Sequence, residues 1–341
     1  MSVWVSIRRT FEMAKAQKIS DQDFINLYKE IGSPAKIAKI TGISERRILA
    51  RRRVIENKYN ISLPSKTTKN PHEKHFNTVH ESPTSINLGM LNGKVLVFSD
   101  AHFLPAVRTT AFKALLWMIG ETKPDVIVAN GDIFDGSTVS RHPAGGWEKL
   151  PTVLEELHAS QACLEEISEA AKQANPNVKL IFTLGNHDAR FGARLATMAP
   201  EYAGVYGFDL ESHFPDWQHC ISCFLNDEIV VMHRWKGGQF AVAGNARMSG
   251  ISYVTGHLHA LQCIPITDFK GTRWGVDTGT LAQPFAQSFN YAMDTPRNWR
   301  SGFVSLSLLD GQLLVPELIM VNDTNPDCVE WRGQVWDVSE F

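Results

Sequence analysis

Five hydrophobic runs between residues 95 and 259 of this chain each lead into a segment that carries aspartate, asparagine or histidine. Each run has the length and apolar pattern of a buried strand, and the runs span residues 95–99, 126–130, 180–184, 229–232 and 252–255. Strands of a parallel or mixed α/β sheet end at a common crevice, where ligands bind. We therefore expect the polar segments to meet at one site. In chain order they are Asp100-Ala101-His102, Gly131-Asp132-Ile133-Phe134-Asp135, Gly185-Asn186-His187-Asp188, His233 and Gly256-His257-Leu258-His259.

The composition excludes the membrane and disulfide-rich classes of protein. Hydrophobic residues make up 43% of the 341 residues, but no apolar run approaches the roughly 18 residues that span a bilayer. Residues 1–20 lack the apolar centre of a signal peptide. The five cysteines are odd in number and scattered, which argues against a secreted disulfide framework. We therefore expect a cytoplasmic protein with no membrane partner.

The net charge of −2 conceals an uneven distribution along the chain. Residues 1–74 contain 16 Lys and Arg against 7 Asp and Glu, a balance of +9. The remaining residues contain 18 against 29, a balance of −11. A basic front segment joined to an acidic remainder predicts two parts with different tasks.

The basic part, residues 1–61, is predicted to be a small helical module. Helical periodicity covers residues 21–31, and Gly32 ends that helix. Ser33 is a suitable N-cap before Pro34 for a second helix, and Ser44 caps a third. The spacing of Ala38, Gly42 and Ile48 resembles the helix-turn-helix modules of bacterial and phage regulators.

This resemblance implies DNA binding through the third helix, with Arg46, Arg47 and Arg51 as candidate contacts. Because such modules often bind paired half-sites, it also makes a homodimer plausible. The alternative is a three-helix bundle used for oligomerisation, with the arginines on a solvated face.

The rest of the chain is expected to contain a linker, a large domain and a tail. Residues 62–92 are rich in polar residues and proline and are predicted to be a linker. Residues 93–320 alternate strands and helices, and residues 321–341 form the tail. Within the domain we expect helices over 107–121 and 152–174 and late strands over 303–309 and 313–318.

The five polar segments offer oxygen and imidazole ligands without thiolate, a set that suits Mn²⁺, Fe²⁺ or Zn²⁺. Asp100 and His102 lie two residues apart, so they are expected to point to the same side of a strand end. A carboxylate at Asp132 can bridge two ions held about 3.5–4 Å apart. Asn186 offers a neutral carbonyl oxygen. We therefore expect two divalent metal ions, with Mn²⁺ as the first choice.

The order D-x-H, G-D-x-x-D, G-N-H-D, H and G-H-x-H resembles the calcineurin-like metallophosphoesterases over residues 93–320. The resemblance implies an α/β fold, a four-layer α/β/β/α sandwich with metals at the strand ends. It assigns one metal to Asp100, His102, Asp132 and His259, and the other to Asp132, Asn186, His233 and His257.

The same resemblance implies the roles of the other site residues. His187 donates a proton or stabilises charge at the transferred phosphoryl group and is oriented by Asp188, while Asp135 supports the ligands. The two cations lower the pKa of a bridging water, so that hydroxide attacks phosphorus in line. Arg141 and Arg190 are candidates for gripping a phosphate oxygen.

Two segments depart from the family pattern without removing a ligand. His233-Arg234 replaces the common His-Gly, and Asp277-Thr278-Gly279-Thr280 replaces the usual Asn-Pro-Gly-Ser. Because both segments depart from the family pattern, the local substrate contacts there are expected to differ from those of the family.

Three functions are compatible with these residues. The first is a phosphodiesterase or nuclease acting on nucleic acid or nucleotides, because G-D-I-F-D and G-N-H-D resemble the nuclease branch of the family. The second is a phosphomonoesterase for a protein or metabolite, and the third is a DNA-binding regulator whose phosphoesterase domain senses a ligand. The combination of modules resembles phage and prophage proteins, which implies the cytoplasm of a bacterial or phage-infected cell.

Overall fold

The computed structural model describes residues 19–59, 61, 63, 84–140, 150–284 and 298–341. The chain divides into two compact units, Met1–Thr78 and Val79–Phe341. Among the described residues, no helix combines the length and apolar character needed to cross a membrane.

The first unit contains the three predicted helices, α2 (Asp21–Ile31), α3 (Pro34–Thr41) and α4 (Glu45–Tyr59). The predicted caps of α3 form, since Ser33 Oγ accepts from Lys36 N at 3.4 Å and Gly42 ends the helix with a left-handed φ of 72°. The helices enclose a small apolar core made of Phe24, Ile25, Leu27, Tyr28, Ile37, Ile48, Ile55 and Leu63.

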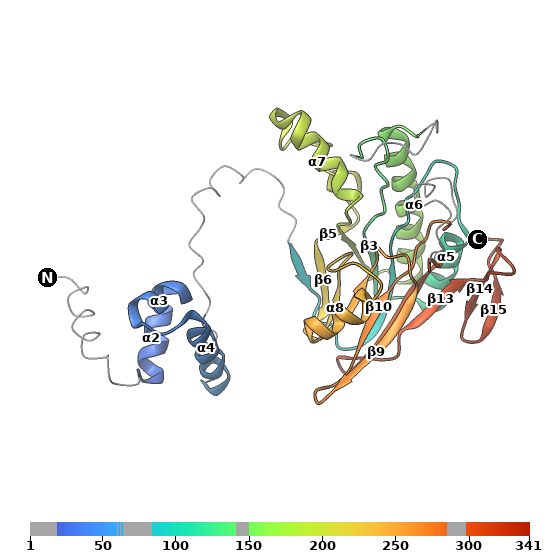
Figure 1. The fold of residues 1–341 in the computed structure, drawn as a ribbon. Coiled ribbons are helices and arrows are strands. Elements are labelled where there is room, and N and C mark those ends of the chain that lie inside the picture. Colours follow the sequence, from blue (N-terminus) through green and yellow to red (C-terminus); the bar gives the residue numbers. More distant parts are fainter. Residues whose placement is uncertain (1–18, 60, 62, 64–83, 141–149, 285–297) are drawn as a thin grey trace. The chain divides into compact units, whose positions relative to one another are not determined.

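The second unit contains two β-sheets (Figure 1). In the larger sheet the described strands run in the order β15-β14-β13-β11-β2-β3-β4-β5, and β12 pairs with β11. Its strands are β2 (Gly93–Phe98), β3 (Val126–Asn130), β4 (Lys179–Thr183), β5 (Gln218–Cys220), β11 (Gly302–Leu309), β12 (Gln312–Leu313), β13 (Glu317–Val321), β14 (Cys328–Trp331) and β15 (Gln334–Asp337).

The smaller sheet has the order β1-β6-β7-β8-β10-β9. Its strands are β1 (Ser85–Asn87), β6 (Ser222–Asn226), β7 (Ile229–Val231), β8 (Ser252–Thr255), β9 (Gln262–Asp268) and β10 (Gly271–Asp277). The described helices of this unit are α5 (Thr110–Thr122), α6 (Val153–Ala174), α7 (Asp188–Met198) and α8 (Ala241–Ser249), with short 3-10 turns at Pro200–Tyr202 and Glu211–His213.

The side chains of β2 point alternately into two different cores, which shows how the layers stack. Leu96 and Phe98 pack into the core that the larger sheet shares with α5 and α6. Val95 and Val97 face the opposite way, into the core between the two sheets. On the outer face of the smaller sheet, Tyr253 packs with Ala246 of α8. The predicted four-layer α/β/β/α sandwich is therefore confirmed.

The ends of this unit differ from the sequence-based boundaries. Residues 84–92, placed in the linker, contribute β1, which pairs in parallel with β6. Residues 321–341, expected to be a tail, contain β14 and β15, and Val329 and Val338 are buried in the main core. Both segments mix polar and apolar residues, and their burial depends on long-range pairing that periodicity does not reveal.

A single strand was expected over residues 313–318, but the structure has two short strands there, β12 and β13. Pro316 lies between them. Proline has no N–H to donate to a β-ladder, which explains the interruption.

Candidate active site and metal centre

The predicted segments follow strands that lie side by side. In the larger sheet β2, β3 and β4 are parallel neighbours, and in the smaller sheet β7 and β8 are parallel neighbours. Their carboxyl ends therefore face the same edge, as a ligand site in an α/β sheet requires.

The site backbone is held in an uncommon conformation. Five of the predicted metal ligands have positive φ, a region that costs free energy for residues with a side chain. They are Asp100 (51°), His102 (42°), Asp132 (53°), His257 (71°) and His259 (56°). Asp100 and His102 therefore lie beyond the end of β2 with left-handed backbone conformation, and not on the extended strand end that their spacing predicted.

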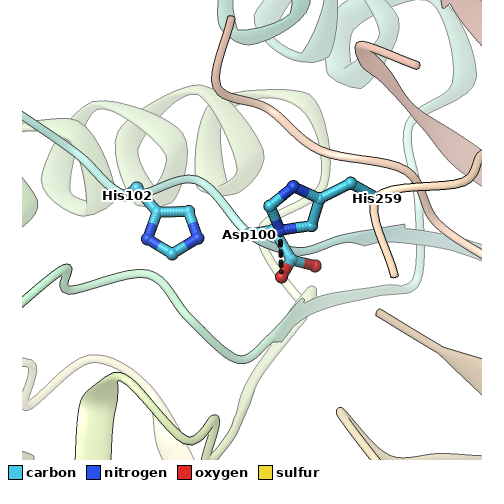
Figure 2. A group of neighbouring side chains, drawn as sticks. All are labelled: Asp100, His102 and His259. Atoms are coloured by element: carbon cyan, nitrogen blue, oxygen red, sulfur yellow. Dashed lines mark hydrogen bonds and ion pairs between the residues drawn. The ribbon is translucent and has the colours of Figure 1, made fainter. Parts of the chain in front are cut away.

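The first group of possible ligands consists of Asp100, His102 and His259, which offer one atom each within 4.8 Å of one another (Figure 2). All three are buried. Asp100 Oδ1 lies 3.0 Å from His259 Nε2, and Asp100 Oδ2 accepts from the backbone N–H of His257 at 2.9 Å. The Asp100 carboxylate therefore ties the last strand-end segment to the first.

The second group consists of Asp132, His233 and His257, with the same 4.8 Å spacing. His233 Nδ1 donates to Asn130 O at 2.8 Å, so its Nε2 faces Asp132 Oδ2, 3.2 Å away. A metal-binding histidine typically has its second nitrogen fixed in this way.

Burial and the neighbouring charges together set the ionisation of these groups. Burial opposes ionisation of Asp132, but the neighbouring His233, His187 and His102 outweigh it and lower the pKa of Asp132. Burial, followed by the charge of His233, lowers the pKa of His257 to about 4. A neutral His257 ring keeps a lone pair for a metal ion.

Asn186 gives an independent test of whether a cation fits. Its Oδ1 is buried and has no hydrogen-bond partner among the described residues. A buried carbonyl oxygen is nearly always paired, and a cation held by Asp132, His233 and His257 would satisfy it. The donor set of carboxylate, amide oxygen and imidazole therefore fits divalent metal binding.

His187 is held by Asp135. Its Nδ1 lies 2.9 Å from Asp135 O and 3.1 Å from Asp135 Oδ1, which also lies 2.9 Å from His102 Nδ1. Arg190 donates from Nη2 to His187 Nε2 at 2.9 Å and from Nη1 to Asp135 O at 3.0 Å. One carboxylate thus positions both His102 and His187.

The expectation that Asp188 orients His187 is wrong. Asp188 begins α7 and its carboxylate accepts from the backbone N–H groups of Asp132, Ile133, Phe134 and Gly185 at 2.7 to 3.0 Å. Burial, helped by the charge of Asp132, raises the pKa of Asp188 to about 7. Asp188 therefore fixes the loop that carries Asp132, and Asp135 takes the orienting role.

The turn after β10 supports the site from behind. Thr280 Oγ1 donates to Asp100 O at 2.6 Å, and Thr278 Oγ1 lies 2.6 Å from Ser99 Oγ. Ser99 in turn donates to the Asp100 carboxylate. Sequence reasoning noted Asp277-Thr278-Gly279-Thr280 as a departure but missed this supporting role; the signal available was the pair of hydroxyls, Thr278 and Thr280, in a segment that replaces a common family turn.

The other arginines predicted to contact phosphate or DNA differ in their exposure and in their partners. Arg141 lies outside the described residues. Arg46 and Arg47 are exposed on α4. Arg51 is half-buried, forms an ion pair with Asp21 at 3.3 Å and donates to Ile19 O, so it is engaged within its own module and does not extend into solvent as a DNA contact would.

Comparison with known proteins gives a family match, two relatives by sequence and one solved structure. The family model for calcineurin-like phosphoesterases matches residues 93–272. The Gene 54 protein of Mycobacterium phage L5 is 26% identical over 270 residues, covering 73% of this chain and all of the phage protein. The Gene 54 protein of Mycobacterium phage D29 is 24% identical over 276 residues, with the same coverage. A solved structure described as a novel archaeal phosphodiesterase aligns with 71% of this chain and 99% of its own, at 13% identity and a TM-score of 0.34.

Proposed function

The chain belongs to the calcineurin-like phosphoesterase family and is a hydrolase of phosphoester bonds; from this we propose that it is a phosphodiesterase acting on nucleic acid or nucleotides with two divalent metal ions. Mn²⁺ is the first choice of metal, with Fe²⁺ and Zn²⁺ as alternatives.

The observation that carries the proposal is the pair of ligand groups at neighbouring strand ends, together with the unpaired Asn186 oxygen. When bound, the two cations supply the positive charge that activates water as a nucleophile and neutralises phosphoryl oxygens. One position would be held by Asp100, His102, Asp132 and His259, and the other by Asp132, Asn186, His233 and His257.

His187 is the proposed proton donor to the leaving oxygen, through Nε2. Burial opposes the charged ring, but Asp135 and Asp132 outweigh it and raise the pKa of His187. The Arg190 guanidinium can only donate hydrogen bonds. When His187 Nε2 is protonated it can no longer accept, so the hydrogen bond from Arg190 to Nε2 must break. Its freed guanidinium is then available to a non-bridging phosphate oxygen, the role expected of Arg190 from the sequence.

The first unit supports a nucleic-acid substrate. Its basic balance and the exposed Arg46 and Arg47 suit a polyanion, and we assign it the task of bringing the enzyme to DNA, as a homodimer on paired half-sites. The phage relatives support a place in the cytoplasm of a phage-infected bacterial cell.

The test compares Mn²⁺-dependent hydrolysis of bis-p-nitrophenyl phosphate with that of p-nitrophenyl phosphate. We expect a preference for the diester, which Asp132→Ala abolishes. The exposed His158 on α6 gives a matched control, because His158→Ala removes an imidazole that belongs to neither ligand group. A preference for the monoester would indicate a phosphatase. If neither substrate were hydrolysed in the presence of Mn²⁺, a ligand-sensing regulator would be favoured.

A second measurement isolates the role of His187. A p-nitrophenolate leaving group needs little protonation, whereas an alkoxide needs a general acid, which contributes about 10²- to 10⁴-fold. His187→Ala should therefore slow hydrolysis of an alkyl diester far more than that of an aryl diester. Equal losses on both would assign His187 to charge stabilisation.

A further inference from the structure

The loop between β7 and α8 is unusual for its composition. Residues 234–240, Arg234-Trp235-Lys236-Gly237-Gly238-Gln239-Phe240, are all exposed. Residues 229–267 contain Arg234, Lys236 and Arg247 but no aspartate or glutamate. From residue 75 onward the chain carries 18 basic against 29 acidic residues, so this stretch is a local reversal of sign.

The loop borders the proposed metal centre. Arg234 directly follows His233, one of the proposed metal ligands, so the loop begins at the edge of that centre. The loop then leads into α8, the helix on the outer face of the smaller sheet (Figure 1).

Two aromatic side chains lie exposed on the same loop. Trp235 stacks on Tyr253 with ring centroids 5.5 Å apart, which fixes the indole, and 43% of its surface remains exposed. Phe240 is 79% exposed, a large value for an apolar ring that has no role in the core. Lys236 Nζ lies 5.9 Å from the Trp235 ring centroid, so charge and aromatic surface are interleaved.

We propose that the loop of residues 234–240 is a binding surface for single-stranded nucleic acid that leads the strand to the metal centre. Cationic groups beside exposed rings are what a single strand requires, because phosphates bind Lys and Arg while bases stack on aromatic faces. Duplex DNA does not present free base faces, and the acidic remainder of the unit disfavours binding a polyanion elsewhere on it. This inference rests on the proposed function, because it assumes that the metal centre hydrolyses the bound strand.

The test measures the binding of fluorescently labelled dT₁₂ and rU₁₂ to the full chain by fluorescence anisotropy. A chelator is present so that the strand is not cleaved. The double variant Lys236→Gln/Phe240→Ala is expected to raise the Kd by about 10- to 100-fold for both oligomers, from the loss of one stacked base and one phosphate contact. The slope of log K against log salt should decrease by about 0.7, the value for one phosphate contact on a single strand.

The tip of the β9–β10 hairpin offers a matched control. Phe269 there is fully exposed and is followed by Lys270, so Lys270→Gln/Phe269→Ala removes the same groups at another place. We expect this control to bind as the wild type does, with circular dichroism confirming that both variants are folded.

A Kd for the loop variant within twofold of the wild type for both oligomers would overturn the proposal, as would an equal loss in the hairpin control. Loss of single-strand binding on Arg46→Gln/Arg47→Gln alone, with the loop variant unaffected, would assign the binding to the first unit. Hydrolysis of bis-p-nitrophenyl phosphate by the wild type tests the proposed phosphodiesterase activity separately. A failure of that activity can therefore be distinguished from a failure of strand binding by the loop.

Discussion

Replacing Gly185 with alanine should damage the site even though the backbone there is not in a glycine-specific conformation. An ideal Cβ at Gly185 would lie 2.2 Å from both N and Oδ1 of Asp132, whereas ordinary contact begins at 3.4 Å. The difference, 3.4 − 2.2 = 1.2 Å, must come from movement of the Asp132 loop, because the first of these atoms is backbone.

At pH 8, above the pKa of both Asp132 and Asp188, that movement breaks two hydrogen bonds that involve charged carboxylates. Asp132 N donates to Asp188 Oδ2 at 2.7 Å, and Asp132 Oδ1 accepts from His187 N at 2.7 Å. Hydrogen bonds to charged groups contribute about 1.5–3 kcal/mol each, so the expected loss is about 3–6 kcal/mol. A typical domain has only about 5–15 kcal/mol of stability in all, so the variant should be close to unfolding.

The assay is urea unfolding followed by tryptophan fluorescence with a chelator present, so that lost metal binding does not add to the result. All tryptophans except Trp4 lie after residue 79, so the signal reports the second unit. Gly192→Ala in α7 is the control, because no atom beyond the backbone of its own helix lies within 4 Å of an added Cβ and alanine should stabilise the helix by about 0.5–1 kcal/mol. A Gly185→Ala variant within about 1 kcal/mol of the wild type would refute the packing argument.

Three further outcomes are expected. Asp132→Ala should lose bound Mn²⁺ from both positions by elemental analysis, and wild-type metal content would contradict its bridging role. Burial and the nearby Asp135 raise the pKa of Glu156 to about 7, from 4.5. A raised carboxyl pKa means that stability falls as pH rises from about 4.5 to 7, so Glu156→Gln should gain about 2–3 kcal/mol over the wild type at pH 8 and little at pH 4, measured by urea unfolding. Ile48→Ala, at a side chain only 1% exposed, should cost the first unit about 2–5 kcal/mol by calorimetry, with phosphoesterase activity unchanged.

The sequence by itself determined several strands and helices of both units and the residue types at the strand ends. The runs at 126–130 and 252–255 coincide with β3 and β8, and the predicted helix at 21–31 coincides with α2. These features are local, because apolar periodicity, caps and turn glycines act over a few residues. The ligand chemistry was equally readable, since only a few residue types can hold a divalent cation.

Only the tertiary structure decided how those side chains are oriented. Asp135 orients His187 across 52 residues of sequence, and Thr280 supports Asp100 across 180. No periodicity encodes such pairs, because they arise when separate strands are brought to one edge of the sheets. The same reason explains why β1, β14 and β15 escaped prediction: short segments of mixed polarity become strands only where a neighbouring strand supplies hydrogen-bond partners.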